Sequence, residues 1–227
     1  MSSSFTNLKG NNDTINDKSG KETMHTTDNH EREVKFFILD QQEMQDRLST
    51  LGTILLKNRV YEINLRFDTV SQTLREKHQV LRLRKDDQNH LTFKDQADLS
   101  NGIADRRELE ITIDNFDVAR SILEALGYHV FMIYEKYRTT YQFKKCEIVL
   151  DELPFGFFVE IEGLPIDAIH STANELGLDW EKRITLSYLD LFNNLKVNKK
   201  LQIENIVFES FKNKIFIESD FIKRIIE

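Results

Sequence analysis

The chain has 227 residues, and its 31 Lys and Arg residues against 38 Asp and Glu residues give a formal net charge of −7. This length suits one large domain or two small ones with a buried core. No apolar run approaches the roughly 18 residues of a membrane span, and no basic start precedes an apolar stretch, so we expect neither membrane insertion nor export. The single cysteine, Cys146, excludes an internal disulfide, and we expect a cytoplasmic protein.

Residues 1–29 are predicted to form a disordered polar tail, because they are mostly Ser, Thr, Asn, Asp and Lys. Strands are predicted near 31–39, 56–68, 79–86, 90–96, 104–113, 130–145, 146–152 and 156–163. Helices are predicted over Gln41–Leu51, Phe116–Leu126 and Asp167–Leu176, each followed by a glycine that suits a helix end. Many strands and few helices predict an α+β protein, mainly antiparallel β, with an eight-stranded closed β-barrel.

The C-terminal part has a different pattern. Beyond a barrel domain at residues 30–195, we predict a helical C-terminal extension at residues 196–227. Apolar residues recur there at near four-residue steps, as in one or two amphipathic helices over Val197–Glu227; they are Ile203, Val207, Phe211, Ile215, Ile222 and Ile226. Packing against the outside of the barrel is the simplest expectation, and a homodimer contact or a lid is the alternative.

Each predicted strand has a charged face opposite an apolar face. Successive strand residues point to opposite sides, so residues i and i+2 lie on the same side. The charged sides hold Glu31, Glu33, Lys35, Arg82, Arg84, Lys94, Arg106, Glu108, Glu110, Lys136, Arg138, Glu160 and Glu162. If helices cover the apolar faces, these charges line the interior of the barrel. Burying them costs several kcal/mol per ion unless they are paired or bind a ligand, so the pattern predicts a binding site.

The residue types indicate which ligand such an interior would hold. Glutamate carboxylates are hard oxygen ligands that suit Mg²⁺ or Mn²⁺. Arg and Lys side chains match phosphate oxygens. The sequence has no glycine-rich phosphate loop and no zinc-binding motif, so charged side chains would do this work. It also lacks the basic stripe that nucleic-acid binding requires, and we therefore expect a small-molecule polyphosphate rather than a nucleic acid.

Several motifs follow one another in a characteristic order. They are Glu31-Arg-Glu33-Val-Lys35, Phe67-Asp68-Thr69, Leu81-Arg82-Leu83-Arg84-Lys85, Thr92-Phe93-Lys94, Arg107-Glu108-Leu109-Glu110, Glu135-Lys136-Tyr137-Arg138, Leu150-Asp151 and Gly156-Phe-Phe-Val-Glu160-Ile-Glu162-Gly163. In this order they resemble the CYTH superfamily of triphosphate tunnel metalloenzymes over roughly residues 30–190. That superfamily includes class IV adenylyl cyclases, thiamine triphosphatases and inorganic triphosphatases.

The resemblance implies a role for each matching residue in an eight-stranded antiparallel tunnel that holds Mg²⁺ or Mn²⁺. The implied metal ligands are Glu31, Glu33, Glu160 and Glu162. Asp151, Glu108 and Glu110 would be supporting acids that act as ligands or position water. The triphosphate would be held by Lys35, Arg82, Arg84, Lys94, Arg106, Lys136 and Arg138, with Arg183 as a late basic candidate. Strand alternation selects Arg106 rather than Arg107.

The chain also departs from the family pattern. Many relatives have an aromatic Y-F-D sequence where this chain has Asn64-Leu65-Arg66-Phe67-Asp68, and the extension past residue 195 has no clear counterpart. The leading hypothesis is metal-dependent hydrolysis of an inorganic or organic triphosphate. The alternatives are a class IV adenylyl cyclase, which makes cyclic AMP and pyrophosphate from ATP, and a non-catalytic polyphosphate-binding module. Both enzyme reactions need the same basic cradle, so the strand motifs fit either one.

Overall fold

The computed structural model describes residues 29–221 of the chain. Its strands are β1 (His30–Ile38), β2 (Ile54–Asp68), β3 (Val80–Lys85), β4 (Asn89–Lys94), β5 (Ala104–Thr112), β6 (His129–Phe143), β7 (Cys146–Leu153) and β8 (Gly156–Gly163). Its α-helices are α1 (Gln41–Thr50), α2 (Thr73–Glu76), α3 (Phe116–Ala125), α4 (Ile166–Glu175) and α5 (Tyr188–Lys199), and its 3-10 helices are η1 (Trp180–Lys182), η2 (Phe208–Phe211) and η3 (Glu218–Asp220). The prediction for the tail at 1–29 falls almost wholly outside the described residues.

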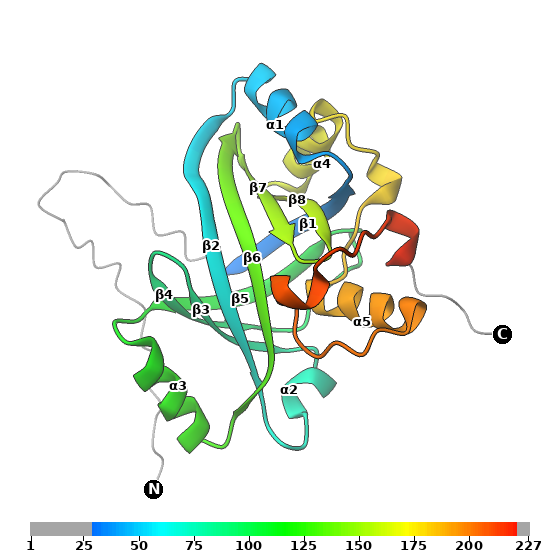
Figure 1. Cartoon of the computed structure of the whole chain (residues 1–227). Coiled ribbons are helices and arrows are strands. Elements are labelled where there is room, and N and C mark those ends of the chain that lie inside the picture. Colours follow the sequence, from blue (N-terminus) through cyan, green and yellow to red (C-terminus); the bar gives the residue numbers. More distant parts are fainter. Residues whose placement is uncertain (1–28, 222–227) are drawn as a thin grey trace, which may run out of the picture.

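The strands close into an antiparallel ring, which confirms the predicted α+β fold with an eight-stranded barrel (Figure 1). Around the ring the order is β1-β5-β4-β3-β2-β6-β7-β8, and β1 completes it by pairing with both β5 and β8. The long strands β2 and β6 pair from Ile54 opposite Gln142 to Asp68 opposite His129. Closure pairs the strand edges that would otherwise be open to other chains.

Helices cover the apolar outer faces of the ring on two sides. Val34 of β1 is fully buried in a cluster that includes Leu48 of α1 and Ile169 of α4. On another side, Leu123 of α3 packs in a cluster with Leu65 of β2. Since strand residues alternate, the charged neighbours of these apolar residues point into the ring.

The helix ends follow the predicted glycine positions. Gly52, Gly127 and Gly177 follow α1, α3 and α4 with φ angles of 69°, 90° and 68°, in the left-handed region where glycine avoids the Cβ clash. At the other ends of α1 and α3, the side chains of Asp40 and Asn115 each accept a hydrogen bond from the third helical N–H. No helix in the described part of the chain is long and apolar enough to cross a lipid bilayer.

The C-terminal part differs from the prediction. Helix α5 begins well before residue 197, and residues 201–221 are irregular apart from η2 and η3. The prediction of amphipathic helices over Val197–Glu227 is therefore wrong for residues 201–221. Its last apolar positions, Ile222 and Ile226, lie outside the described residues.

Backbone pairing and aromatic packing explain this difference. β6 extends beyond β7, which pairs with it only from Tyr137 onward. At the part of β6 that β7 does not reach, the backbone pairs with Ile206. The Ile206 N–H donates to the Ile133 carbonyl at 2.9 Å, and the Ile206 carbonyl accepts from the Glu135 N–H at 2.8 Å. Farther on, Phe211 enters an apolar cluster with α5. The four-residue apolar spacing therefore reflects separate anchoring points on the barrel and on α5.

Candidate functional site

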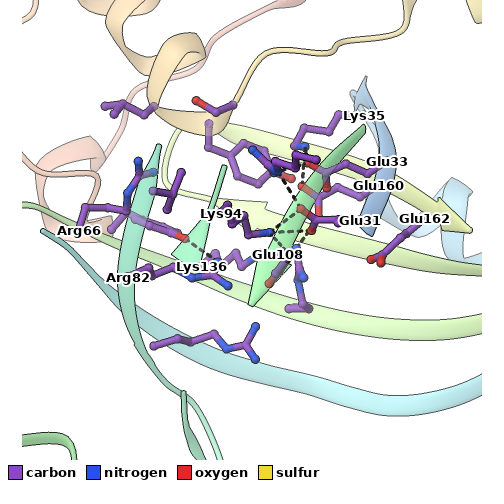
Figure 2. Close-up of a pocket in the computed structure, with 18 of the residues that line it drawn as sticks. Glu31, Glu33, Lys35, Arg66, Arg82, Lys94, Glu108, Lys136, Glu160 and Glu162 are labelled. Atoms are coloured by element: carbon purple, nitrogen blue, oxygen red, sulfur yellow. Dashed lines mark hydrogen bonds and ion pairs between the residues drawn. The ribbon is translucent and has the colours of Figure 1, made fainter. Parts of the chain in front are cut away.

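The inward faces of all eight strands enclose a cavity of about 330 Å³ (Figure 2). Its charged lining consists of Glu31, Glu33, Lys35, Arg66, Arg82, Arg84, Lys94, Arg106, Glu108, Glu110, Lys136, Arg138, Glu147, Glu160 and Glu162. The structure thus brings all four predicted metal ligands into one cavity with most of the predicted triphosphate-binding residues. Because the outer faces are covered by helices, the charges are concentrated in this enclosed space.

A first group of ion pairs joins β1 to β4 and β5. The Glu31 carboxylate contacts Lys94 Nζ at 2.6 Å and Arg106 Nε at 2.9 Å. The Glu33 carboxylate contacts Arg106 at 2.8 Å and Lys35 Nζ at 2.6 Å. Burial favours a higher pKa for Glu31, but attraction to Lys94 and Arg106 holds that pKa well below its ordinary value. Cations from neighbouring strands therefore keep Glu31 ionised.

A second group surrounds Asp151 of β7, which is 1% exposed. Its carboxylate accepts hydrogen bonds from Lys136 Nζ at 2.9 Å, from Arg138 Nε at 2.7 Å and from the Tyr188 hydroxyl at 2.9 Å. Arg138 also contacts Glu160 at 2.5 Å. Burial disfavours the charged guanidinium, yet Asp151 and Glu160 hold the pKa of Arg138 well above its ordinary value.

Asp151 was predicted to be a metal ligand or to position water, and that role stays a prediction. The residue lies opposite the inward-facing Arg138 in the β6–β7 register but is not among the residues that line the cavity. Its hydrogen-bonding capacity is taken up by the two cations of β6 and by Tyr188 of α5. Asp151 is therefore a positioning residue, which orients the Lys136 and Arg138 side chains toward the cavity.

A third group joins β3, β4 and β5 around Glu110. Its carboxylate accepts from Thr92 Oγ1 at 2.7 Å and from Arg84 at 3.0 Å, with Arg82 at 3.5 Å and His90 Nδ1 at 3.1 Å. Burial favours a higher pKa, but Arg84 and the Thr92 hydrogen bond lower the pKa of Glu110. Glu110 thus holds the two arginines in place, as an ionised acceptor.

Glu162 differs from these acids, because no cation of the described residues lies within ion-pair distance of its carboxylate. Burial, together with the carboxylates of Glu31, Glu33 and Glu147, raises its pKa to about 8. Glu147 lies directly opposite Glu162 in the β7–β8 register, and burial also raises the pKa of Glu147. This side of the cavity has an excess of carboxylate groups, which a cation would relieve.

The predicted metal ligands Glu31, Glu33, Glu160 and Glu162 lie on one side of the cavity in Figure 2. Between residues 29 and 221, no three acidic, His or Cys side chains are already gathered as a formed metal site. Lys and Arg side chains contact three of these four carboxylates. Their oxygen donors suit Mg²⁺ or Mn²⁺, and such an ion would exchange with the ammonium and guanidinium partners.

Arg183 is a predicted triphosphate-binding residue that the structure does not bring to the cavity. Its Nε donates to the Gly102 carbonyl at 2.9 Å and another guanidinium nitrogen donates to the Trp180 carbonyl at 2.9 Å. It therefore fastens the β4–β5 loop to η1, and it does not lie with the other predicted triphosphate-binding residues. Arg107, which alternation placed outside, is 3.7 Å from Asp95 and does not line the cavity.

The structure also shows residues that the sequence argument missed. They are the lining residues Arg66, Tyr134, Glu147 and Tyr188, and the buried Glu62, which lies 3.6 Å from Lys136. Strand alternation predicts the inward position of the residues that lie on strands. Arg66, for example, faces inward because the preceding residue, Leu65, faces outward. Tyr188 lies on α5, a helix that was not predicted.

Both the sequence and the fold of this chain are similar to those of known proteins. The family model of the CYTH domain matches residues 29–206. A protein of Methanocaldococcus jannaschii described as a "putative adenylate cyclase" is 26% identical over 133 residues, which cover 58% of this chain and 75% of that protein.

Solved structures share the fold. An adenylate cyclase candidate from Vibrio parahaemolyticus is 21% identical, with a TM-score of 0.65 over 72% of this chain and 97% of its own. The PH1819 protein of Pyrococcus horikoshii is 22% identical, with a TM-score of 0.62 over 72% and 98%. A Hippeastrum protein, described as a "putative adenylyl cyclase" with a dominant triphosphatase activity, is 19% identical, with a TM-score of 0.54 over 72% and 95%. With the family match over most of its length, this chain belongs to the CYTH domain family.

Proposed function

We propose that this chain is an enzyme that hydrolyses a triphosphate inside the cavity in the presence of Mg²⁺ or Mn²⁺. The observation that carries the proposal is the convergence of acidic and basic side chains from eight separate strands in one enclosed space. Members of the CYTH family act on triphosphates such as ATP, and the description of the Hippeastrum protein names triphosphatase activity.

The basic side chains would bind and orient the phosphate chain. Lys136 and Arg138 are held from behind by Asp151, so their free N–H groups can point to phosphate oxygens in the cavity. Arg82 and Arg84 are held in the same manner by Glu110. Because these cations are fixed before the substrate enters, little reorganisation is needed to align the reacting phosphoryl group.

A divalent cation would be held by Glu31, Glu33, Glu160 and Glu162. When bound, it would neutralise negative charge on the phosphoryl oxygens. The unpaired carboxylate of Glu162 and its acidic neighbours are the structural support for this assignment. Lys35, Lys94 and Arg106, which pair with these glutamates, also line the cavity and would bind the phosphate oxygens.

Glu108 is our candidate for positioning the attacking water and accepting its proton. It lines the cavity and contacts Lys94 Nζ at 2.7 Å. Burial raises the pKa of Glu108, and the nearby Glu31 adds to this effect while Lys94 opposes it. A carboxylate with a raised pKa is a better proton acceptor near neutral pH.

The proposal is tested by phosphate release from tripolyphosphate, thiamine triphosphate and nucleoside triphosphates, each with Mg²⁺ or Mn²⁺. We expect release from at least one of these substrates and at least about a 100-fold loss of turnover in Glu108→Gln. Absence of release from every substrate would contradict the proposal, and tight binding of tripolyphosphate without release would favour a non-catalytic binding module.

The second candidate is an adenylyl cyclase, which is favoured by the description of the Methanocaldococcus jannaschii relative. In that reaction the ribose 3′-hydroxyl attacks the α-phosphorus of ATP, and pyrophosphate leaves. The same basic cradle would serve it. Formation of cyclic AMP from ATP with Mn²⁺, measured beside phosphate release, separates the two reactions.

A further inference from the structure

The cations that line the cavity contact carboxylates, with one exception among the described residues. Lys94 and Arg106, for example, are paired with Glu31. Arg66 of β2 lines the same cavity, but none of the ion pairs in residues 29–221 includes it. Its Nε is enclosed and has no hydrogen-bond partner. Arg66 therefore has no carboxylate within ion-pair distance among the described residues, although its guanidinium carbon lies 5.9 Å from the centre of the Phe131 ring and Asp190 attracts it from farther away.

The surroundings of Arg66 make this arrangement costly for the protein alone. Burial lowers its pKa to about 10, and repulsion from Arg82 and Arg106 adds to the effect, while Tyr134 opposes it. The guanidinium still carries its charge at neutral pH. A half-buried guanidinium that lines the cavity and has no carboxylate partner keeps N–H donors that an anion in the cavity can accept from.

A second unpartnered polar group lies beside it on the same face of β2. Asn64 is fully buried, and neither its side-chain oxygen nor its nitrogen has a hydrogen-bond partner. In the sheet register Asn64 lies opposite Arg84 on one side and Tyr134 on the other. Asn64 is not among the residues that line the cavity, so Arg66 is the side chain of this pair that an occupant can reach.

Arg66 and the acidic residues around Glu162 lie at opposite ends of the cavity, so a bound phosphate chain would have a defined orientation. In Figure 2, Arg66 and Arg82 lie on the side of the cavity opposite Glu162. A phosphate chain with one end near the glutamates would have its other end near Arg66. A shorter chain held at the acidic side would not extend as far.

We propose that Arg66 is a specificity-determining residue, whose guanidinium binds the terminal phosphoryl group of the substrate and so discriminates a three-phosphate chain from a two-phosphate chain. The inference rests on the proposed function because it requires a phosphate chain in the cavity. The terminal phosphoryl group offers oxygens for a bidentate contact with the guanidinium.

The test compares tripolyphosphate and pyrophosphate binding by calorimetry with Mg²⁺ present, in the Glu108→Gln background, where cleavage is expected to be slow. We expect Arg66→Gln to weaken tripolyphosphate binding about tenfold or more and pyrophosphate binding by less than about threefold. Arg66→Lys should restore part of the difference, since it keeps the charge but loses the bidentate contact. Arg107→Gln, on the outer side of β5, is the matched control and should bind both anions like the Glu108→Gln parent.

The outcomes separate this inference from the proposed hydrolysis. Equal weakening for both anions, or unchanged tripolyphosphate binding in Arg66→Gln, would overturn the role of Arg66. Selective weakening, together with no phosphate release by the wild type with Mg²⁺ or Mn²⁺, would support Arg66 and contradict hydrolysis. The ligand-free Arg66→Gln protein should unfold at the same or a higher temperature than the wild type, because an unpaired charge is removed; a lower temperature would indicate a structural role instead.

Discussion

Glu160 and Glu162 lie two residues apart on the same face of β8, yet their surroundings are opposite. The Glu160 carboxylate lies 3.3 Å from Lys35 and 2.5 Å from Arg138. Burial opposes the effect, but these cations lower the pKa of Glu160 below its ordinary value. Burial and neighbouring carboxylates instead raise the pKa of Glu162 to about 8.

The difference between these two glutamates extends to the regions around them. Around Glu160 and Asp151, acids and bases neutralise one another, and the result is a stable frame for the cavity wall. Around Glu162 the acids are in excess, and at Arg66 a base is in excess. Charges that match hold the protein together, whereas charges without a partner are available to a ligand. Substitutions in the two kinds of region should therefore have different consequences.

The largest expected effect is a loss of turnover when a glutamate is replaced on the side of the cavity where acids are in excess. Glu162→Gln should lower phosphate release by about 100-fold or more while leaving the unfolding free energy unchanged or slightly higher, since it removes an unpaired carboxylate. Glu33→Gln should also lower turnover by orders of magnitude. Glu152→Gln, which alters a glutamate paired with Arg59 outside the cavity, is the control. Near wild-type rates in both cavity variants would remove these residues from the metal site.

Substitutions around Glu160 and Asp151, where acids and bases are paired, should mainly change the free energy of unfolding. Asp151→Asn leaves Lys136 and Arg138 without their shared carboxylate, and we expect it to lower the unfolding free energy by about 3 kcal/mol or more, measured by denaturant titration. Asp105→Asn, at a less buried pair with Arg32, should cost about 1 kcal/mol or less. Equal losses in the two variants would contradict the distinction between a central frame and a peripheral ion pair.

A smaller effect, with a defined pH dependence, is expected at Glu62. Burial opposes ionisation, but Lys136, Arg138 and the β3 arginines lower the pKa of Glu62 to about 2. The stabilisation from this shift is fully present above the ordinary pKa of a glutamate and disappears as the pH falls through about 2. Glu62→Gln should thus lower the unfolding free energy by up to about 3 kcal/mol at pH 7. The difference in unfolding free energy between this variant and the wild type should shrink as the pH falls from 4.5 to 2. A difference that stays constant over this range would contradict the lowered pKa of Glu62.

Strand alternation was sufficient to predict the ring and most of the cavity lining. Arg82 and Arg84 point inward because Leu83 between them packs outside. The same rule places Arg66 inside the ring, because it follows Leu65, which packs outside. Its inward position is therefore a property of the strand pattern and not of any motif.

Other features depend on contacts between distant parts of the chain. Glu160 and Glu162 have the same sequence context, and only ring closure brings Lys35 to the first and Glu147 to the second. Tyr188 reaches the cavity because α5 packs near Asp151, and nothing in the local pattern predicts this contact. Local periodicity therefore predicts which side chains enter the cavity, while their ionisation depends on the assembled neighbours.

The most direct test is anomalous diffraction from crystals that contain Mn²⁺ and tripolyphosphate. We predict a manganese peak beside Glu162 and Glu33, with phosphate density that runs from this peak along Lys136 and Arg138 toward Arg66. Manganese and tripolyphosphate bound only on the outer surface, with the same ion pairs left unchanged inside the cavity, would contradict the account.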